Sequence, residues 1–252
     1  MLSIGGIPML LPLTQVRLLA PLPRPSSIRL FSAFEAHTAM VYGFAQQSVP
    51  PTWYQSPAFT FGHHGAVYGP DAHISLPLSG HLDYELGIAC VIGSDGRDIR
   101  PDAAADYIAG YTIINSWVSR HPDWLEPLAG LTNAKNRDFA LSLGPWLVTP
   151  DELELYAEDD GRHNLMLIAR VNQIERSRDT LANIGYTFAE MIAYASRDTM
   201  LYAGDVLGSG PCGTGSLFAV SGGYGPWLAA GDQVELEITA LGTLSNQIAH
   251  EY

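Results

Sequence analysis

The stretch DYELGIACVIG, residues 83–93, decides the fold of this chain. From Ile88 to Ile92 it is continuously apolar, which is typical of a strand covered on both faces. Asp83 and Glu85 are two residues apart, so in a strand they point to the same face. Buried carboxylates are costly unless a metal, an arginine or a proton pairs with them. The stretch therefore predicts either a charged site at the head of a buried strand or a strand end that reaches solvent.

The composition indicates an acidic globular protein. The chain has 252 residues, 47% of them hydrophobic and 15% charged, which allows one large domain or two small ones with a sizeable core. Its 26 Asp and Glu residues against 13 Lys and Arg residues give a net charge of −13. Because phosphate binding requires a concentrated basic surface, we expect neither a nucleic acid nor an anionic membrane as a partner.

Cysteine usage and the N-terminal residues indicate a cytoplasmic protein. Cys90 lies inside the apolar run and Cys212 is far from it in sequence, so we expect no disulfide framework and no cysteine-based zinc site. Residues 1–22 lack the basic head and uninterrupted apolar core of a signal peptide, because Arg17 is the first basic residue and prolines interrupt the segment. No run approaches the roughly 18 apolar residues of a membrane span. We therefore expect a soluble, cytoplasmic chain.

The N-terminal 50 residues are expected to form a strand, a proline-rich arm and a helix. Val16–Leu19 has strand character, and prolines dominate residues 21–25. Ser26 or Ser27 is a candidate cap for a helix that runs on towards Phe44.

The rest of the chain is expected to contain short strands and few helices. Strands are predicted at 111–114, 165–171, 174–177 and 233–238, and helices from Pro101 and from the capping box Thr187–Glu190. Residues 53–80 suit short strands and turns, and no internal repeat or linker is present. We expect residues 1–50 to pack on a core of residues 51–252, so that the chain forms effectively one domain.

Residues 115–145 form an irregular segment that combines aromatic and cationic residues. It contains Trp117, Arg120, Trp124, Lys135 and Arg137. Loops of this composition often line functional sites, although a solvated loop is the commoner outcome.

Seven motifs resemble the fumarylacetoacetate hydrolase family, in the family's order and from about residue 16 to 248. They are SIRLFSAFEAH, WYQSPAF, DYELGIACVIG, IAGYTIINSW, FALSLGPWLVTPDEL, GDVLGSGPCGTG and LGTLSNQI. The resemblance implies an α+β, β-rich fold, a mixed β-sandwich roll with a few short helices, and a homodimer. It also implies a small-molecule enzyme, since members cleave C–C bonds in diketo acids or isomerise, decarboxylate or dehydrate 2-oxo acids. They typically use Mg²⁺ or Ca²⁺ held by acidic side chains.

The chain departs from the family at the positions expected to hold that ion. Gly87 stands in place of a second glutamate, Ser116 in place of an aspartate, and Leu30 where longer members have an acid. Only Glu85 remains. Because hard divalent cations need several oxygen ligands, we expect no metal cofactor. If Mg²⁺ or Ca²⁺ is bound, Asp83 is the candidate second ligand beside Glu85.

The remaining matched positions predict an acid/base site. His37 matches the family's N-terminal histidine, and Arg120 its conserved arginine. The family's lysine aligns with Arg137, with Lys135 as a neighbour that can substitute. The predicted catalytic residues are therefore His37, Glu85, Arg120, Lys135 and Arg137, and the predicted substrate-binding residues are Glu35, Ser116, Trp117, Trp124 and Gly210. Burial without a metal is expected to raise the pKa of Glu85 towards neutrality.

This pattern predicts a metal-independent lyase, isomerase or cyclase repurposed from a C–C hydrolase fold. Its substrate would be an enolisable polyketide-like or oxo-acid compound of a biosynthetic pathway, changed by tautomerisation, decarboxylation or cyclisation while a guanidinium holds the enolate. One alternative is a metal-dependent hydrolase of a 1,3-diketo acid, with His63, His64 or His121 as replacement ligands. Another is a non-catalytic protein of the same fold, for which a collapsed pocket is expected.

Overall fold

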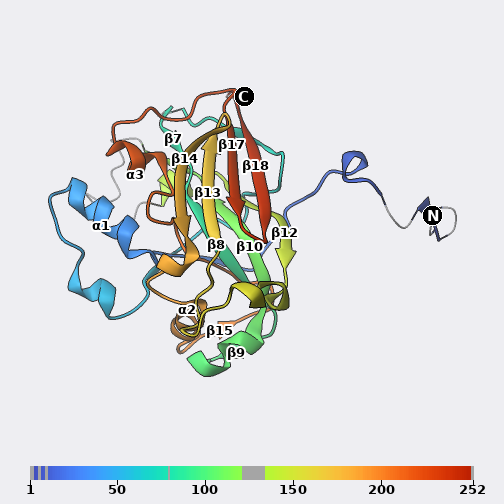
Figure 1. Ribbon diagram of the computed structural model, residues 1–252, viewed down its shortest axis with the longest axis vertical. Coiled ribbons are helices and arrows are strands. Elements are labelled where there is room, and N and C mark those ends of the chain that lie inside the picture. The colour runs from blue at the N-terminus through green and yellow to red at the C-terminus, as the bar shows by residue number, and fades with distance from the viewer. Residues whose placement is uncertain (1–2, 5–6, 9–10, 79, 121–133, 251–252) are drawn as a thin grey trace.

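Two β-sheets form the body of the molecule (Figure 1). The computed structural model describes residues 3–4, 7–8, 11–78, 80–120 and 134–250. The larger sheet has the order β4-β3-β16-β8-β10-β12-β5, and the smaller has the order β14-β13-β17-β18-β6. In those orders the strands are Phe59–Phe61, Ile28–Phe31, Val206–Gly208, Leu86–Ile92, Ile108–Ser116, Leu141–Val148 and Val67–Tyr68, then Ile174–Thr180, Met166–Val171, Gln233–Ile238, Gly242–Ala249 and His73–Ser75.

Short elements complete the fold. Two-residue strands pair as β1 with β2, β7 with β11, and β9 with β15: Ser3–Ile4 with Ile7–Pro8, Leu82–Asp83 with Val118–Ser119, and Gly96–Arg97 with Met200–Leu201. The α-helices are α1 (Glu35–Phe44), α2 (Phe188–Ala195) and α3 (Leu217–Ser221). The described 3₁₀ turns are η1 (Leu13–Gln15), η2 (Pro51–Tyr54), η3 (Pro101–Tyr107), η5 (Lys135–Arg137), η6 (Pro150–Tyr156) and η7 (Leu181–Asn183). This β-rich architecture with few short helices confirms the fold class expected from the sequence.

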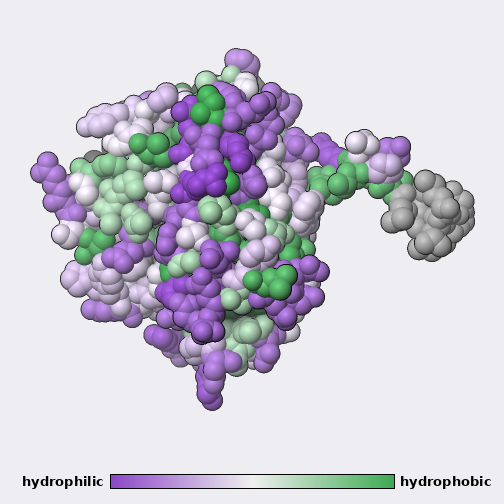
Figure 2. Space-filling model, viewed as in Figure 1, coloured by the Kyte–Doolittle hydropathy of each residue, from purple (hydrophilic) through white to green (hydrophobic). Residues whose placement is uncertain are grey.

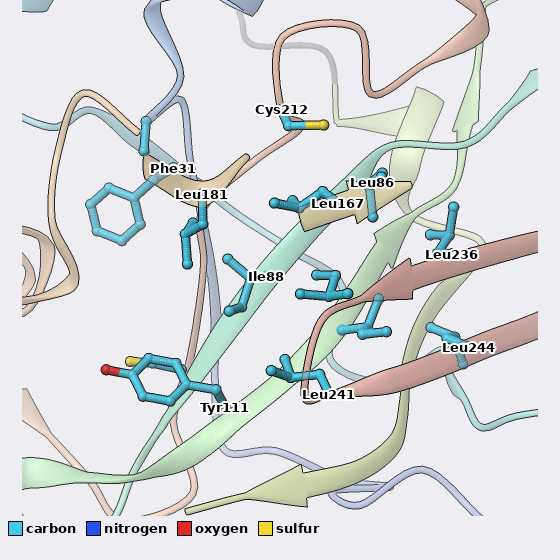
Figure 3. Packing of buried hydrophobic residues seen from close by; sticks show 14 of the residues in the cluster. Phe31, Leu86, Ile88, Tyr111, Leu167, Leu181, Cys212, Leu236, Leu241 and Leu244 are labelled. Atoms are coloured by element: carbon cyan, nitrogen blue, oxygen red, sulfur yellow. The ribbon is translucent and has the colours of Figure 1, made fainter. Parts of the chain in front are cut away.

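Strand β8 is buried on both faces, as its apolar run predicts. Leu86 and Ile88 belong to the cluster between the two sheets, with Leu167 of β13 and Leu236 of β17 (Figure 3). Ala89 points the other way, into a second cluster formed with strands β3, β10, β12 and β16. Because side chains alternate along a strand, Gly87 lies on the same side as Ala89, and Glu85 directly precedes the strand. The functional site is therefore to be sought on the face of the larger sheet that is turned away from the smaller one.

Several local predictions are confirmed. Thr187 and Glu190 form the reciprocal hydrogen bonds of a capping box, and the apolar stripe of α2 behind them is buried. Asn172 and Gln173 both have positive φ in the turn between β13 and β14. Buried and partly exposed side chains alternate along β17. Both cysteines are buried free thiols.

Two N-terminal predictions are wrong. Residues 16–19 form no strand, and they follow η1 without a pairing partner among the described residues. Ser26 and Ser27 cap no helix, because Ile28–Phe31 instead forms β3, which pairs with β16 and β4. All four residues of β3 are buried, so tertiary pairing outweighs the local capping signal. Helix α1 starts only at Glu35.

The first described residues extend away from the sheets (Figure 1). Leu11, Leu13 and Leu19 are exposed on this segment, which projects from the body in Figure 2. None of the helices in the described part of the chain is long and apolar enough to cross a membrane.

Candidate active site

The predicted strand is interrupted between its two carboxylates and the apolar run that follows them. β7 ends at Asp83 and β8 begins at Leu86, so Tyr84 and Glu85 lie between them. The Glu85 N–H donates to Oδ1 of Asn115 at 3.0 Å, and the Leu86 N–H donates to the Gly215 carbonyl at 2.8 Å. The break places the two carboxylates in different surroundings.

Asp83 is fully buried and serves the fold. Its carboxylate accepts the N–H groups of Tyr84 at 2.8 Å, Leu217 at 2.8 Å and Phe218 at 3.1 Å, and Nε of Arg120 at 3.0 Å. Burial raises the pKa of Asp83, whereas Arg120 and the two N–H groups at the start of α3 oppose that rise. Because donors occupy both oxygens, the carboxylate is the form that fits, and it fixes α3 to the end of β7.

Glu85 lies between two guanidinium groups. Its Oε1 accepts from Nη2 of Arg120 at 2.9 Å, and its Oε2 accepts from Nη1 of Arg137 at 3.2 Å. Burial acts to raise the pKa of Glu85, but Arg137 and Arg120 outweigh it, so the pKa lies below its ordinary value of 4.5. The expectation of a pKa near neutrality is wrong, because the arginines supply the positive partners that an ion would otherwise supply. Glu85 is therefore a carboxylate at neutral pH.

His37 supplies the neutral titratable group of the site. It lies on the buried face of α1, and its Nδ1 is 3.3 Å from the Gly213 carbonyl oxygen. Because a carbonyl can only accept, Nδ1 carries the proton and Nε2 is left as an acceptor. Burial lowers the pKa of His37 below 6.5, although the nearby Glu85 acts in the opposite direction. The histidine is thus a neutral base at pH 7.

These groups line one cavity of about 380 Å³. His37, Glu85, Arg120 and Arg137 all reach it, together with Gly87, Ser116 and Gly210. The Ser116 Oγ is buried and has no hydrogen-bond partner among the described residues. An unpaired buried hydroxyl beside a cavity is suited to a polar group of a ligand.

Three predicted site residues do not line the cavity. Trp117 directly follows the last residue of β10. It is fully buried in the core, where its Nε1 donates to Oγ of Ser142. Lys135 is 62% exposed in its side chain and pairs with Asp138 at 2.8 Å. Glu35 is exposed on α1, where it accepts from the Tyr54 hydroxyl at 2.6 Å. Trp124 and His121 lie outside the described residues.

No local sequence pattern predicts one part of the cavity wall. This part of the wall comes from α1, from β4 and from the residues beside β3 and β4. Its side chains are those of Ser32, Thr38, Tyr42, Phe59 and Thr60. Their approach to β8 is set by the strand order, in which β3 and β16 separate β4 from β8.

The side chains present do not fit the divalent cation of the family. Both oxygens of Glu85 face guanidinium groups, and both oxygens of Asp83 are taken by other donors. A Cβ at Gly87 would lie 2.6 Å from the Gly210 carbonyl oxygen, so the missing carboxylate has no space. Within the described part of the chain, no three His, Cys, Asp or Glu side chains converge as ligands. His63 and His64 are exposed and are not among the cavity-lining residues.

Comparison with known proteins identifies relatives over most of the chain. Oxaloacetate tautomerase Fahd2a, mitochondrial, of Rattus norvegicus is 31% identical over 243 residues, which cover 95% of this chain and 71% of the relative. A 2,4-didehydro-3-deoxy-L-rhamnonate hydrolase of a Sphingomonas species is 32% identical over 186 residues, 73% of this chain and 62% of the relative. These relatives are enzymes of different reaction types.

A solved structure agrees with both the fold and the family. The 5-carboxymethyl-2-hydroxymuconate delta-isomerase of Mycobacterium smegmatis superposes with a TM-score of 0.72 at 26% identity, covering 96% of this chain and 83% of that one. The family model for the fumarylacetoacetate (FAA) hydrolase C-terminal region matches residues 27–249. The chain therefore belongs to the fumarylacetoacetate hydrolase family.

Proposed function

We propose that this chain is an enzyme that moves a proton on a small enolisable 2-oxo acid without a divalent cation. The observation that carries the proposal is the cavity in which neutral His37 meets the Glu85 carboxylate and its two guanidinium groups. The rat relative named as an oxaloacetate tautomerase supports a reaction of this type. The donor set around Glu85, which does not fit a divalent cation, supports the absence of a metal step.

The proton transfer follows from the protonation states of the site. Nε2 of His37 takes a proton from the carbon next to the 2-oxo group, and the electron pair of that C–H bond moves to form the C=C bond of an enolate. The negative charge develops on the oxygen, where the guanidinium of Arg137 or Arg120 stabilises it. The imidazolium then gives its proton to that oxygen, which yields the enol and restores neutral His37.

Glu85 has a supporting role in this scheme. As a carboxylate with a lowered pKa it is a poor proton donor at neutral pH, but it fixes the two guanidinium groups at the cavity wall. Both arginines stay protonated and so hold charge without exchanging protons. A decarboxylation or cyclisation of a polyketide-like compound would use the same stabilised enolate.

The open cavity favours an enzyme over a non-catalytic protein of the same fold. A partner protein would have no need to keep about 380 Å³ of space beside His37 and Glu85. The hydrolase alternative requires replacement ligands, and of its candidates His63 and His64 are exposed outside the cavity lining.

The test follows the enol absorbance of oxaloacetate and of phenylpyruvate with protein that has been treated with EDTA and desalted. We expect ketonisation faster than the spontaneous rate and unchanged by chelator. A His37→Gln variant is expected to lose at least about 100-fold of that rate, the usual contribution of a general base. His64→Gln, a substitution of an exposed histidine outside the cavity lining, is the matched control. One divalent ion bound per chain, with activity lost on its removal, would overturn the proposal.

A further inference from the structure

The cavity has a charged end, built where β8 and β10 adjoin. Glu85 precedes β8 and Ser116 ends β10, and Ser116 N–H donates to the Glu85 carbonyl at 3.3 Å. Arg120 and Arg137 meet Glu85 from the segments that follow. Every arginine that lines the cavity among the described residues is therefore held at this end.

The opposite end has no charged side chain among the described lining residues, and its lining is largely apolar with a hydroxyl from Thr60 of β4. From β8 the strand order passes through β16 and β3 to β4, three strand spacings or about 14 Å. Leu30 and Phe59 line the cavity from β3 and β4, and Val41 and Tyr42 line it from α1.

Gly208 of β16 lets the apolar walls approach each other. A Cβ at Gly208 would lie 3.1 Å from Cδ2 of Leu30 and 3.1 Å from Cδ1 of Ile114. These two cavity-lining side chains thus approach each other over a position of β16 that has no side chain. The result is an apolar stretch of wall between the charged end and β4.

The distribution of charge limits what the cavity can hold. At the charged end the carboxylates of Asp83 and Glu85 balance the guanidinium groups of Arg120 and Arg137. One carboxylate of a ligand can bind there through the partly exposed Arg137, whose side chain is 23% exposed. A second carboxylate placed against the buried Leu30 would lose its hydration without meeting a cation among the described lining residues.

We infer that the cavity selects enolisable 2-oxo acids that carry a single carboxylate and an apolar substituent, and discriminates against dicarboxylates. This inference rests on the proposed function, because it names the substrate class of the same site. Phenylpyruvate and oxaloacetate form a matched pair of probes, since each has a CH₂ group between the 2-oxo carbon and a phenyl ring or a carboxylate.

The first experiment compares kcat/KM for enolisation of these two acids by the full chain. We expect phenylpyruvate to be preferred by at least about tenfold, the selectivity that one misplaced polar group produces. A parallel calorimetric titration uses 3-phenylpropanoate and succinate, which cannot react. We expect only 3-phenylpropanoate to bind.

A pair of charge variants on one helix tests the apolar end directly. Val41→Lys places a cation at the cavity wall, whereas Ala39→Lys places the same charge on the exposed side of α1, outside the lining. Val41→Lys is expected to shift the preference towards oxaloacetate by about fivefold, the effect of one partly exposed ion pair. Ala39→Lys is expected to leave the preference unchanged.

The outcomes separate the two claims. Equal or better turnover of oxaloacetate by the wild-type chain would overturn the inference and leave the proposed function standing. Selective binding of 3-phenylpropanoate with no turnover of either acid would support the selectivity and overturn the proposed function. Absence of both binding and turnover would overturn both.

Discussion

Asp83 and Glu85 are two residues apart and share one guanidinium, yet they belong to different regions of the molecule. Arg120 donates through Nε to Asp83 and through Nη2 to Glu85. Asp83 faces the start of α3 and is closed off on all sides, whereas Glu85 faces the cavity. The same functional group, a carboxylate, thus serves the fold at one position and the site at the other, and the difference comes from what lies opposite each of them.

The largest effect is expected on the stability of the fold, when Asp83 is replaced. Asp83→Ala removes the partner of Arg120 and of two N–H groups of α3, so we expect a loss of about 3–5 kcal/mol in the free energy of unfolding. Urea unfolding measures it. Asp138→Ala, which removes a partly exposed surface pair with Lys135, is the control and should cost no more than about 1 kcal/mol. Equal stability of the two variants would contradict a structural role for Asp83.

Substitution of His37, which faces the cavity, is expected to have the opposite effect: a small loss of stability and a large loss of activity. His37→Gln removes one 3.3 Å hydrogen bond, so we expect a loss of stability of about 1 kcal/mol. Enolisation should nevertheless fall by about 10²–10⁴-fold, because the base is gone. Steady-state kinetics and urea unfolding on the same samples give both values. A variant that loses stability and activity in proportion would place His37 with Asp83 rather than with the site.

Arg137 is expected to lie between these extremes. Arg137→Met leaves Glu85 with Arg120 alone and removes a cation from the cavity, so kcat/KM should fall about 10- to 100-fold. The cost in stability should be well below that of Asp83→Ala, since the Arg137 side chain is 23% exposed. Arg162→Met, distant in sequence and outside the cavity lining, serves as the control. An unchanged kcat/KM would remove Arg137 from the site.

The smallest effect is expected on the pH dependence of enolisation. Burial lowers the pKa of His37 below 6.5, so more than half of the base is still neutral when the pH has fallen to that value. Enolisation should therefore keep more than half of its rate down to about pH 6.5 and decrease further at lower pH. The pH profile of kcat/KM checks this, and His64→Gln should show the same profile. A decrease that begins above pH 7 would contradict a neutral, buried His37.

The sequence predicts those features of the fold that depend on local patterns. The apolar run of residues 88–92 predicted a doubly buried strand, and the Thr187 capping box predicted the start of α2. The strand β3 was missed because its pairing partners lie far away in the chain: Val206 is opposite Ile28, and Phe61 is opposite Arg29. No local pattern contains those contacts.

The same limit applies to the site. The residues at positions 37, 85, 120 and 137 were identified from motifs, and the structure brings all four to one cavity. The prediction for the pKa of Glu85 has the wrong direction because the motifs do not show that Arg137, 52 residues away, donates directly to its carboxylate. The apolar wall from α1 and β4 depends on the strand order, which the motifs do not specify.

The most direct test of the central claim, proton transfer by His37 without a divalent ion, is deuterium exchange at the CH₂ group of phenylpyruvate. ¹H NMR in D₂O follows the exchange, with EDTA-treated and desalted protein and with the spontaneous rate subtracted. We expect exchange catalysed by the wild-type chain and by His64→Gln, unaffected by added Mg²⁺, and lost in His37→Gln. Exchange that requires Mg²⁺, or that persists in His37→Gln, would contradict this claim.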